Sequence, residues 1–461
     1  MGNECDPHAD IDQQSPTEKA VGGNAKPPLR QISFLAIADL SPAPHNPRKH
    51  SRAQIRAIAR SIETFGFNAP ILVDRNRQII AGHGRYEAAK LNGHTQVPVI
   101  FLDHLTDTQA KAYMLADNKL TDRSTWDDAK VAIQLKELSD LALDFDIEAI
   151  GFELPEIDFR IQSLDTSDSA DMADEFETST GPAVSTAGDL WLLGPHRLFC
   201  GNALEETAYT TLMEAEKAAA VFTDPPYNVK IDGNVSGNGS ITHREFAMAS
   251  GEMTKPEFTH FLSASMKSIC AHTVPGALIF VCMDWRHMAE MLAAGFASEC
   301  ELLNLCVWAK SNGGMGSLYR SRHELVFVFK NGKEAHLNNV QLGRFGRNRT
   351  NVWNYPGFNG FARKGSEDAS AFHPTVKPIA LVADAMLDST KRDDIVLDPY
   401  IGSGTTILAA ERTGRQCFGI EIDGRYVDTA IARWERLTRR KAQNAQGQTF
   451  AQVKLERGID Q

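Results

Sequence analysis

Residues 221–228 read Val221-Phe222-Thr223-Asp224-Pro225-Pro226-Tyr227-Asn228. The apolar run 218–222 that leads into them predicts a buried strand. Two consecutive prolines fix φ and lack an N–H, so the strand cannot continue through them. The stretch therefore predicts a stiff loop at the carboxyl end of a strand, which is where open α/β sheets bind ligands. An ordinary strand-to-turn exit is the alternative that this motif alone leaves open.

A second strand and loop follow at residues 395–406, which read Ile395-Val396-Leu397-Asp398-Pro399-Tyr400-Ile401-Gly402-Ser403-Gly404-Thr405-Thr406. The glycines permit a tight turn and the close approach of a ligand to the N-terminus of the predicted helix 405–413. Nineteen residues after Gly402, the predicted strand 418–421 ends in Glu421. An acid near this offset binds ribose hydroxyls in dinucleotide folds.

The two motifs together resemble the amino-methylating DNA methyltransferases that use S-adenosylmethionine. Residues 224–227 match the catalytic motif of that family, and residues 398–406 match its cofactor loop, with Tyr400 where Phe is usual. The catalytic motif precedes the cofactor motif, as in the β-type branch. The resemblance covers residues 186–438 and implies an α/β fold, a doubly wound Rossmann-like sheet with both loops at its carboxyl edge.

The resemblance also implies how the reaction proceeds. The target adenine is flipped out of the duplex because its amine is unreachable while stacked and paired. Asp224 and the Pro225 carbonyl accept the two amine hydrogens, Pro226 stiffens the loop, and Tyr227 stacks on the base. No metal is required. The expected cofactor contacts are Asn202, Lys377, Asp398, Pro399, Tyr400, Gly402, Ser403, Gly404, Thr405 and Glu421.

Residues 331–372 interrupt the alternation of strands and helices with a mixture of basic and aromatic side chains. In the β-type order the target-recognition segment stands here, and basic residues can contact phosphates or read guanine. An irregular cap with a small core of its own is the alternative. The expected contacts to double-stranded DNA are Arg344, Arg347, Arg349, Arg363 and Lys364.

Residues 30–120 resemble the N-terminal domain of the ParB-like family. The matching pieces include Asn46-Pro47-Arg48 and the Gly-rich turn 81–85 with its following helix. In that family the turn binds nucleotide phosphates, which makes Gly82 and Arg85 the candidate nucleotide contacts. His83 and Gly84 replace the usual acid and first arginine, so a structural or DNA-contacting role is favoured over a nucleotide switch.

The domain boundaries follow from composition. We expect a disordered tail at 1–28, a smaller α+β ParB-like domain with a helical extension at 29–163, an acidic linker at 164–188 and the methyltransferase domain at 189–445. The linker is rich in Asp, Ser and Thr and poor in large apolar residues. The helical extension offers these leucines and isoleucines as core candidates: Leu115, Leu120, Ile133, Leu138 and Leu141.

Composition excludes several classes of protein. The chain of 461 residues is 42% hydrophobic and 23% charged, and no apolar run approaches the roughly 18–20 residues of a membrane span. Seven cysteines without paired spacing favour a reducing cytoplasm over a disulfide framework or a zinc site. The net charge is −11, but ten Lys or Arg residues between 310 and 364 concentrate positive charge where DNA could dock.

Three alternatives to adenine-N6 methylation of DNA remain open on the sequence. Cytosine-N4 methyltransferases overlap in motif, although they more often have Ser in place of Asp224. A ParB-like DNA-binding regulator with a decayed methylase is a second, and methylation of RNA or protein a third. The sequence also leaves open a homodimer and a restriction partner.

Overall fold

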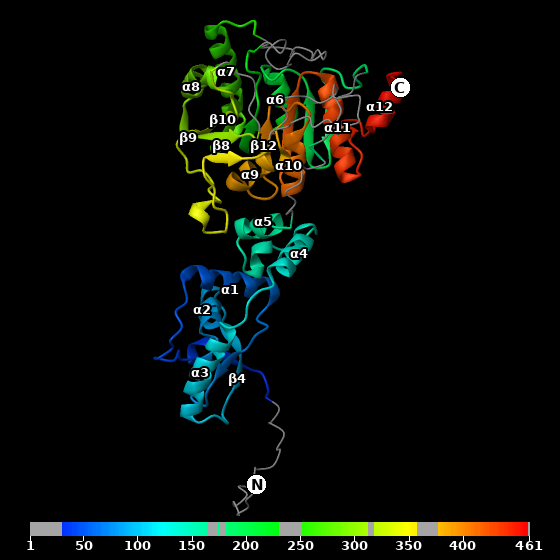
Figure 1. Cartoon of the computed structure of the whole chain (residues 1–461). Coiled ribbons are helices and arrows are strands. Elements are labelled where there is room, and N and C mark those ends of the chain that lie inside the picture. The colour runs from blue at the N-terminus through cyan, green and yellow to red at the C-terminus, as the bar shows by residue number, and fades with distance from the viewer. Residues whose placement is uncertain are drawn as a thin grey trace, which may run out of the picture. The chain divides into compact units, whose positions relative to one another are not determined.

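The computed structural model describes residues 30–164, 173–174, 181–229, 251–311, 318–356 and 377–459. The predicted disordered tail lies outside these ranges. The chain forms two compact units, one of residues 1–125 with 149–151 and one of residues 126–148 with 152–461 (Figure 1). In the described ranges no helix combines the length and apolar composition needed to cross a membrane.

The first unit packs helices against a small mixed sheet with the strand order β1-β4-β2-β3. Ser51 caps the first long helix, as its side chain accepts a hydrogen bond from Gln54 N. The buried core is mainly aliphatic and includes Ile71, Val73 and Val99. The elements are β1 (Ser33–Ala36), η1 (Ile37–Asp39), α1 (Arg52–Phe65), β2 (Ile71–Val73), β3 (Ile79–Ala81), α2 (His83–Leu91), β4 (Gln96–Phe101) and α3 (Asp107–Thr121).

The second unit is built on one large sheet, in the order β11-β9-β10-β8-β7-β12-β13-β6-β5-β14. Its centre, from β8 to β6, is parallel, and antiparallel pairs flank it on both sides. The strands are β5 (Leu190–Leu193), β6 (His196–Cys200), β7 (Ala218–Thr223), β8 (Thr273–Met283), β9 (Cys300–Ala309), β10 (His323–Asn331), β11 (Val352–Asn354), β12 (Ile395–Asp398), β13 (Gln416–Glu421) and β14 (Gln443–Asn444).

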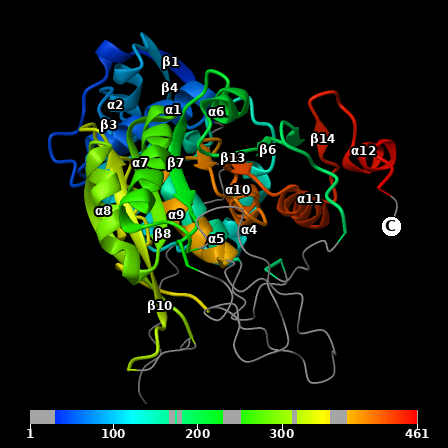
Figure 2. The same cartoon turned by 90° about the horizontal axis from the view of Figure 1, so that it is seen from above.

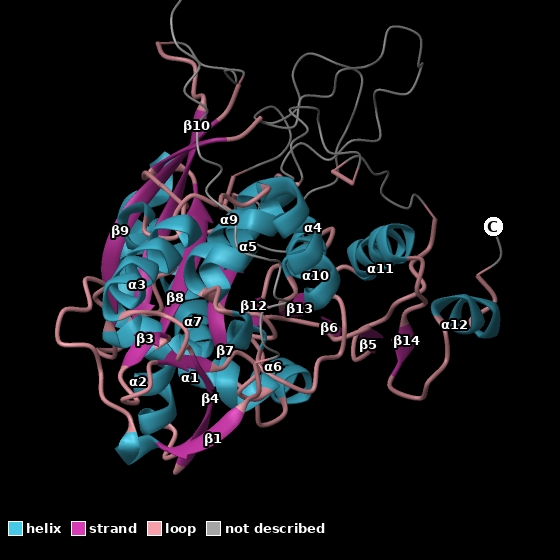
Figure 3. Cartoon of the chain, turned by 90° about the horizontal axis from the view of Figure 1, so that it is seen from below, coloured by secondary structure: helices cyan, strands magenta, loops and turns pink. Residues whose placement is uncertain are grey.

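Helices cover both faces of this sheet (Figure 2, Figure 3). One buried cluster joins the sheet to α9, α10 and α11, and the other joins it to α6, α7 and α8. The predicted doubly wound α/β fold is confirmed. The helices are α4 (Asp128–Ser139), η2 (Ile147–Ile150), α5 (Leu154–Gln162), α6 (Glu206–Met213), α7 (Lys255–Ala271), η3 (Trp285–His287), α8 (Met288–Ala297), η4 (Gln341–Gly343), α9 (Ile379–Ser389), α10 (Thr405–Thr413), α11 (Gly424–Thr438) and α12 (Phe450–Glu456).

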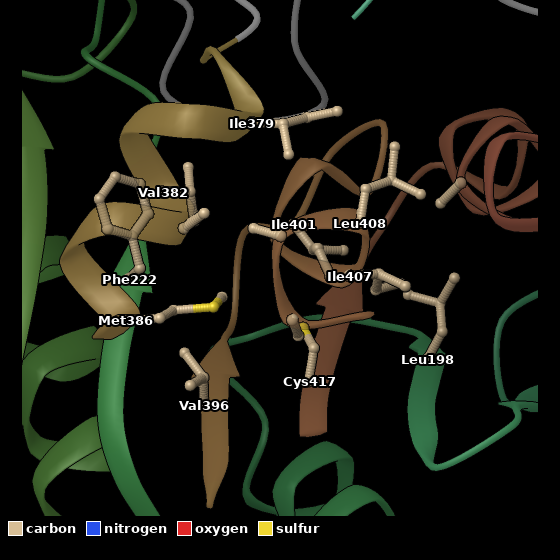
Figure 4. Packing of buried hydrophobic residues seen from close by; sticks show 14 of the residues in the cluster. Leu198, Phe222, Ile379, Val382, Met386, Val396, Ile401, Ile407, Leu408 and Cys417 are labelled. Atoms are coloured by element: carbon tan, nitrogen blue, oxygen red, sulfur yellow. The ribbon is translucent and has the colours of Figure 1, made fainter. Parts of the chain in front are cut away.

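The central strands are apolar on both sides because both of their faces are buried. Phe222 and Val396 face the cluster of α9 and α10 together with Ile407 and Cys417 (Figure 4). Their chain neighbours Val221 and Leu397 belong to the opposite cluster. This alternation fixes the register of β7 and β12, because a slip by one residue would exchange the two faces.

The predicted core of the helical extension was largely wrong. Leu115, Leu120, Ile133 and Leu141 are exposed, and Leu138 is only half-buried. Helix α4 instead buries Val131, Ala132 and Leu135, a face offset from the one that the predicted residues mark, and α3 has no buried residue. The error arose because apolar residues in these helices lie on more than one face.

Helix α5 is held against the rest of the second unit by buried charge. Asp158 pairs with Arg415 at 2.8 Å and with Arg392 at 3.0 Å, and Asp158 and Arg415 are almost wholly buried. Further along, the amides of Val184 and Ser185 donate to the Asp428 carboxylate at 2.6 and 2.9 Å. The end of the stretch predicted as a linker is therefore bound to α11.

Gly404 begins α10 with φ +84°, and a Cβ built on it would lie 2.6 Å from the Ala430 Cβ and 3.0 Å from the Ala430 Cα of α11. We expect Gly404→Ala to lower the free energy of unfolding by at least about 2 kcal/mol, because backbone strain and overpacking add. Gly447→Ala is the matched control, since Gly447 has φ +79° but open space around it. Urea denaturation of both variants measures the difference, and equal losses would contradict the packing argument.

Candidate active site

The two predicted motif loops lie side by side. Strands β7 and β12 are parallel neighbours, with Val396 opposite Ala220 and Leu397 opposite Val221. Strand β13 follows on the other side of β12. The loops that leave these three strands therefore meet at one edge of the sheet, at the carboxyl ends of its parallel core.

Asp398 joins the two loops. Its Oδ1 accepts hydrogen bonds from Thr223 Oγ1 at 2.9 Å and from the Tyr400 amide at 3.2 Å, and its Oδ2 accepts from Thr406 Oγ1 at 2.6 Å. The side chain is buried, and burial raises the pKa of Asp398 to about 7 despite these donors. Asp398 thus fixes the end of β7, directly before Asp224, against the start of α10.

Asp224 receives a donor on each carboxylate oxygen. Tyr227 donates its hydroxyl to Oδ1 at 2.5 Å, and Lys377 Nζ lies 2.5 Å from Oδ2. The Asp224 side chain keeps 27% of its surface exposed, whereas Lys377 keeps 5%. Pro225 is buried and Pro226 half-buried. The loop therefore presents one carboxylate to solvent from a rigid backbone.

Two further charges extend this arrangement into a row. Glu324 lies on β10. Its Oε2 is 3.3 Å from Lys377 Nζ, and its Oε1 is 3.3 Å from Lys310 Nζ. The Trp308 ring is 4.5 Å from Lys310 Nζ and 5.8 Å from Lys377 Nζ. We call Asp224, Lys377, Glu324 and Lys310 the charge quartet.

Burial and pairing act in opposite directions on the pKa values of the quartet. Burial raises the pKa of Asp224, and Lys377 partly offsets that increase. Burial disfavours the charged form of Lys377, but Asp224 and Glu324 outweigh it and raise the pKa of Lys377. Burial also opposes ionisation of Glu324, and the two lysines outweigh it, so the pKa of Glu324 is lowered. Lys377 and Glu324 are therefore charged at neutral pH.

The predicted cofactor loop opens α10. Gly402 has φ +54°, and a Cβ built there meets no atom within 4 Å, so the space beside its backbone is open. Arg433 of α11 holds the other side of the loop, donating to the Ser403 carbonyl at 2.8 Å and lying 3.3 Å from Thr405 Oγ1. The glycines thus have different roles: Gly404 permits packing, and Gly402 borders free space.

The remaining predicted cofactor residues lie at or after the ends of β12, β13 and β6, or directly before α9. Glu421 accepts from the Gly402 amide at 3.0 Å and from the Asp423 amide at 2.9 Å, and burial raises the pKa of Glu421 to about 7. Pro399 is buried, and the ring of Tyr400 packs against Phe261 with centroids 6.1 Å apart. Asn202 closes a turn, accepting from Leu204 N at 3.0 Å. Lys377, by contrast, binds the Asp224 carboxylate.

The basic segment does not present all of its arginines to solvent. Arg347 is 4% exposed and bonds Asp384 and Asp388 of α9 at 3.1 and 2.7 Å. Arg349 bonds the same two aspartates at 2.8 and 3.1 Å. This placement is not that of a DNA contact, so we correct the prediction for Arg347 and Arg349 and assign them to the anchoring of the segment on α9.

Arg344 remains exposed, at 3.1 Å from Glu153. Arg363 and Lys364 lie outside the described residues. Two aromatic residues of the segment, Phe345 and Trp353, are buried, and Trp353 belongs to the short strand β11 that pairs with β9. The segment therefore contributes both to the core of the second unit and to its surface.

In the first unit, Gly82 adopts φ +102° at the start of α2. The Arg85 guanidinium folds over it and donates to the Pro70 carbonyl at 3.1 Å, and burial lowers the pKa of Arg85. His83 accepts from the Ala43 amide at 3.2 Å. Nucleotide binding at Gly82 and Arg85 stays a prediction.

Sequence reasoning missed Glu324 and Lys310. A usable signal existed, because Glu324 is the one acid in the apolar strand sequence Glu324-Leu325-Val326-Phe327-Val328-Phe329. A charge in a strand with two buried faces requires a partner. In the part of the chain that the structure describes, His, Cys, Asp and Glu form no group that could hold a metal ion.

Two parts of the chain match the sequence profiles of known protein families. Residues 218–432 match the sequence profile of the N6/N4 DNA methylase family, and residues 24–119 match that of the ParB N-terminal domain. The chain joins a ParB N-terminal domain to a DNA methylase domain. The methylase match contains the whole of both motif loops, the charge quartet and the basic segment.

Individual relatives match the methylase domain. Type II methyltransferase M2.DpnII of Streptococcus pneumoniae is 29% identical over 242 residues, which are 49% of this chain and 86% of the relative. Type II methyltransferase M2.LlaDCHI of Lactococcus lactis subsp. cremoris is 28% identical over 236 residues, 48% of this chain and 83% of the relative. A putative DNA modification methylase of Thermus thermophilus, solved with S-adenosyl-L-methionine, is 19% identical over 52% of this chain and 93% of its own, with a TM-score of 0.37.

The two arginines of the basic segment give a stability test of the methylase domain. We expect Arg347→Met to lower the free energy of unfolding by about 3 kcal/mol, because it leaves buried carboxylates under-neutralised. Arg344→Met, the matched control, should cost less than about 1 kcal/mol, since its ion pair is exposed. Chemical denaturation of both variants provides the comparison, and a neutral Arg347→Met would show that the buried contacts contribute nothing.

The raised pKa of Asp398 gives a pH test. A carboxyl group whose pKa is higher in the folded than in the unfolded state binds its proton more tightly when folded. Its contribution to the free energy of unfolding therefore decreases as the pH rises from the ordinary pKa of an aspartate toward the pKa of about 7 in the folded protein. Across that range we expect the melting temperature of the wild type to fall as the pH rises. The melting temperature of Asp398→Asn should fall less steeply. Calorimetry from about pH 5 to 8 tests this, and parallel curves would contradict it.

Proposed function

We propose that the methylase domain transfers a methyl group from S-adenosylmethionine to the N6 amine of an adenine flipped out of double-stranded DNA. The observation that carries this proposal is the partly exposed Asp224 carboxylate, held on a rigid proline loop beside the open, glycine-lined start of α10. A substrate amine and a methyl donor can approach each other at this edge of the sheet.

The residues at the start of α10 fit the cofactor. Open space beside Gly402 lets a ligand reach the backbone, and the first amides of α10 are available to polar groups. Glu421 lies at the edge of this space with acceptor capacity left for ribose hydroxyls. The bound cofactor would supply an electrophilic methyl group. We keep Asn202, Tyr400, Gly402, Ser403, Gly404, Thr405 and Glu421 as the proposed cofactor-binding set.

Asp224 would act on the amine. The adenine N6 lone pair is delocalised into the ring, which makes the amine a poor nucleophile. A hydrogen bond from the amine to Asp224 and another to the Pro225 carbonyl would localise that lone pair away from the ring. Tyr227, whose hydroxyl is fixed on Asp224, would offer its ring face to the base. Catalysis in this scheme is positioning plus electrostatic stabilisation.

Cytosine-N4 methylation is the alternative target. Both bases present an exocyclic amine, and the matched family includes enzymes for both. The acid at position 224 favours adenine. For DNA contacts we retain exposed Arg344, together with Arg363 and Lys364 of the same segment, since basic side chains on phosphates supply most of the affinity for DNA.

We expect Asp224→Ala to lower methyl transfer by at least about 100-fold, because the amine loses its acceptor, while the dissociation constant for S-adenosylmethionine changes little. Radiolabelled methyl transfer to duplex DNA and calorimetric cofactor titration measure the two quantities. Glu252→Gln is a control, because it removes an exposed acid outside the proposed catalytic and cofactor-binding sets.

Digestion of the methylated DNA and mass spectrometry of the nucleosides identify the product. N6-methyladenine is the expected product. N4-methylcytosine would overturn the choice of base while leaving the reaction class intact, and near-normal turnover in Asp224→Ala would overturn the reaction scheme.

A further inference from the structure

Glu324 is a buried charge that the proposed reaction scheme leaves without a role. It stands near the start of β10, opposite Trp308 on β9, and only 11% of its side chain is exposed. Nothing in the packing of a strand requires an acid here, because the residues that follow it are apolar and buried. A buried carboxylate needs compensation from cations, and Glu324 has two, Lys377 and Lys310.

Lys377 is shared between two carboxylates. Its Nζ lies 2.5 Å from Asp224 Oδ2, 3.3 Å from Glu324 Oε2 and 3.4 Å from the Tyr227 hydroxyl. The ammonium thus donates hydrogen bonds to Asp224 and Tyr227 and forms an ion pair with Glu324. With Tyr227 on Oδ1, both oxygens of Asp224 already hold a donor before any substrate amine arrives.

This arrangement presents a problem for catalysis. A cation bound tightly to Asp224 withdraws charge from the carboxylate and makes it a weaker acceptor for an amine hydrogen. Without a competing anion, Lys377 would form an undivided ion pair with Asp224. Glu324 is placed to be that competitor, because it approaches the same ammonium from the neighbouring part of the sheet.

We propose that Glu324 is a positioning residue for methyl transfer, which holds part of the Lys377 ammonium and so keeps an acceptor site on Asp224 available to the substrate amine. This inference rests on the proposed methylation at Asp224. Lys310 completes the quartet by pairing with the outer oxygen of Glu324, which leaves the four charges balanced. The face of the Trp308 ring lies within cation–π distance of both ammonium groups.

The groups that face Asp224 come from several elements. Tyr227 lies on its own loop, Lys377 directly before α9 and Glu324 on β10. Two more act on the quartet from a distance, Cys282 of β8 and Asp398 of β12. Of these, Glu324 is the group whose negative charge keeps Asp224 basic against Lys377. Removing that charge should therefore lower the pKa of Asp224.

Glu324→Gln tests the inference, because it keeps shape and removes charge. We expect kcat to fall up to about tenfold, because a less basic carboxylate is a weaker acceptor for the amine hydrogen. The acidic limb of the kcat–pH profile should move to lower pH, because Asp224 loses the neighbouring negative charge that raises its pKa. The affinity for S-adenosylmethionine should stay unchanged. Glu324→Asp, which keeps the charge, should leave the acidic limb at its wild-type position.

Glu301→Gln is the matched control. Glu301 is the cross-strand partner of Lys330 on the same pair of strands, with their charged groups 2.7 Å apart, but far along the strands from Asp224. It should not alter kcat or the pH profile. Melting temperatures of all three variants monitor folding.

Several results would overturn the inference. One is a Glu324→Gln enzyme with wild-type kcat and an unshifted acidic limb. Another is a Glu324→Gln enzyme in which kcat, cofactor affinity and melting temperature all fall together, with no recovery in Glu324→Asp. That result would assign Glu324 to folding alone. If Glu324→Gln does not fold, Glu324→Asp provides the test. An acidic limb that shifts in Glu324→Asp overturns the inference, and an acidic limb at the wild-type position supports it. Failure of the proposed function is separate, because it shows as turnover in Asp224→Ala.

Discussion

The bonds around the Asp398 carboxylate are the constraint on which the second unit depends. Three donors from three places converge on this one buried group: the last residue of β7, the loop after β12 and the first turn of α10. Through Thr223, the backbone that carries Asp224 is fixed relative to the loop that carries Gly402. Because these three hydrogen bonds are buried and come from separate elements, they hold this edge of the sheet in a single arrangement. Catalysis by orientation requires such rigidity, because small misplacements of reacting groups are costly.

Helix α9 connects the Asp224 carboxylate to the basic segment. Lys377 precedes its first turn and binds Asp224, and Asp384 and Asp388 on its body bind Arg347 and Arg349. The helix also packs into the core under β7 through Ile379, Val382 and Met386 (Figure 4). A displacement of the basic segment would therefore act on the same helix whose start positions Lys377. The charge quartet and the anchoring arginines thus share this element.

The sequence predicted the local features of the site well and its long-range pairings poorly. Strand, loop and helix followed from apolar runs, prolines and glycines, all of which act within a few residues. The position of both loops at the carboxyl edge of the sheet followed from the family resemblance. The contact of Lys377 with Asp224 joins residues 153 positions apart, and no local pattern encodes it. Arg347 was misassigned because a cluster of arginines reveals charge but not burial. Glu324 was overlooked although its place in an apolar strand was visible. The roles proposed for the cofactor loop remain predictions.

The attachment of the basic segment has an evolutionary consequence. Asn339 donates to the Leu387 and Thr390 carbonyls at 2.8 Å each, and the two arginines hold the next stretch on the same helix. The chain is thus fastened to the catalytic body before it reaches residues 357–376. Mutations, insertions or deletions beyond that fastening need not disturb Asp224 or its neighbours. Under the function proposed above, evolution could alter the choice of DNA sequence beyond this attachment while the groups around Asp224 keep their contacts.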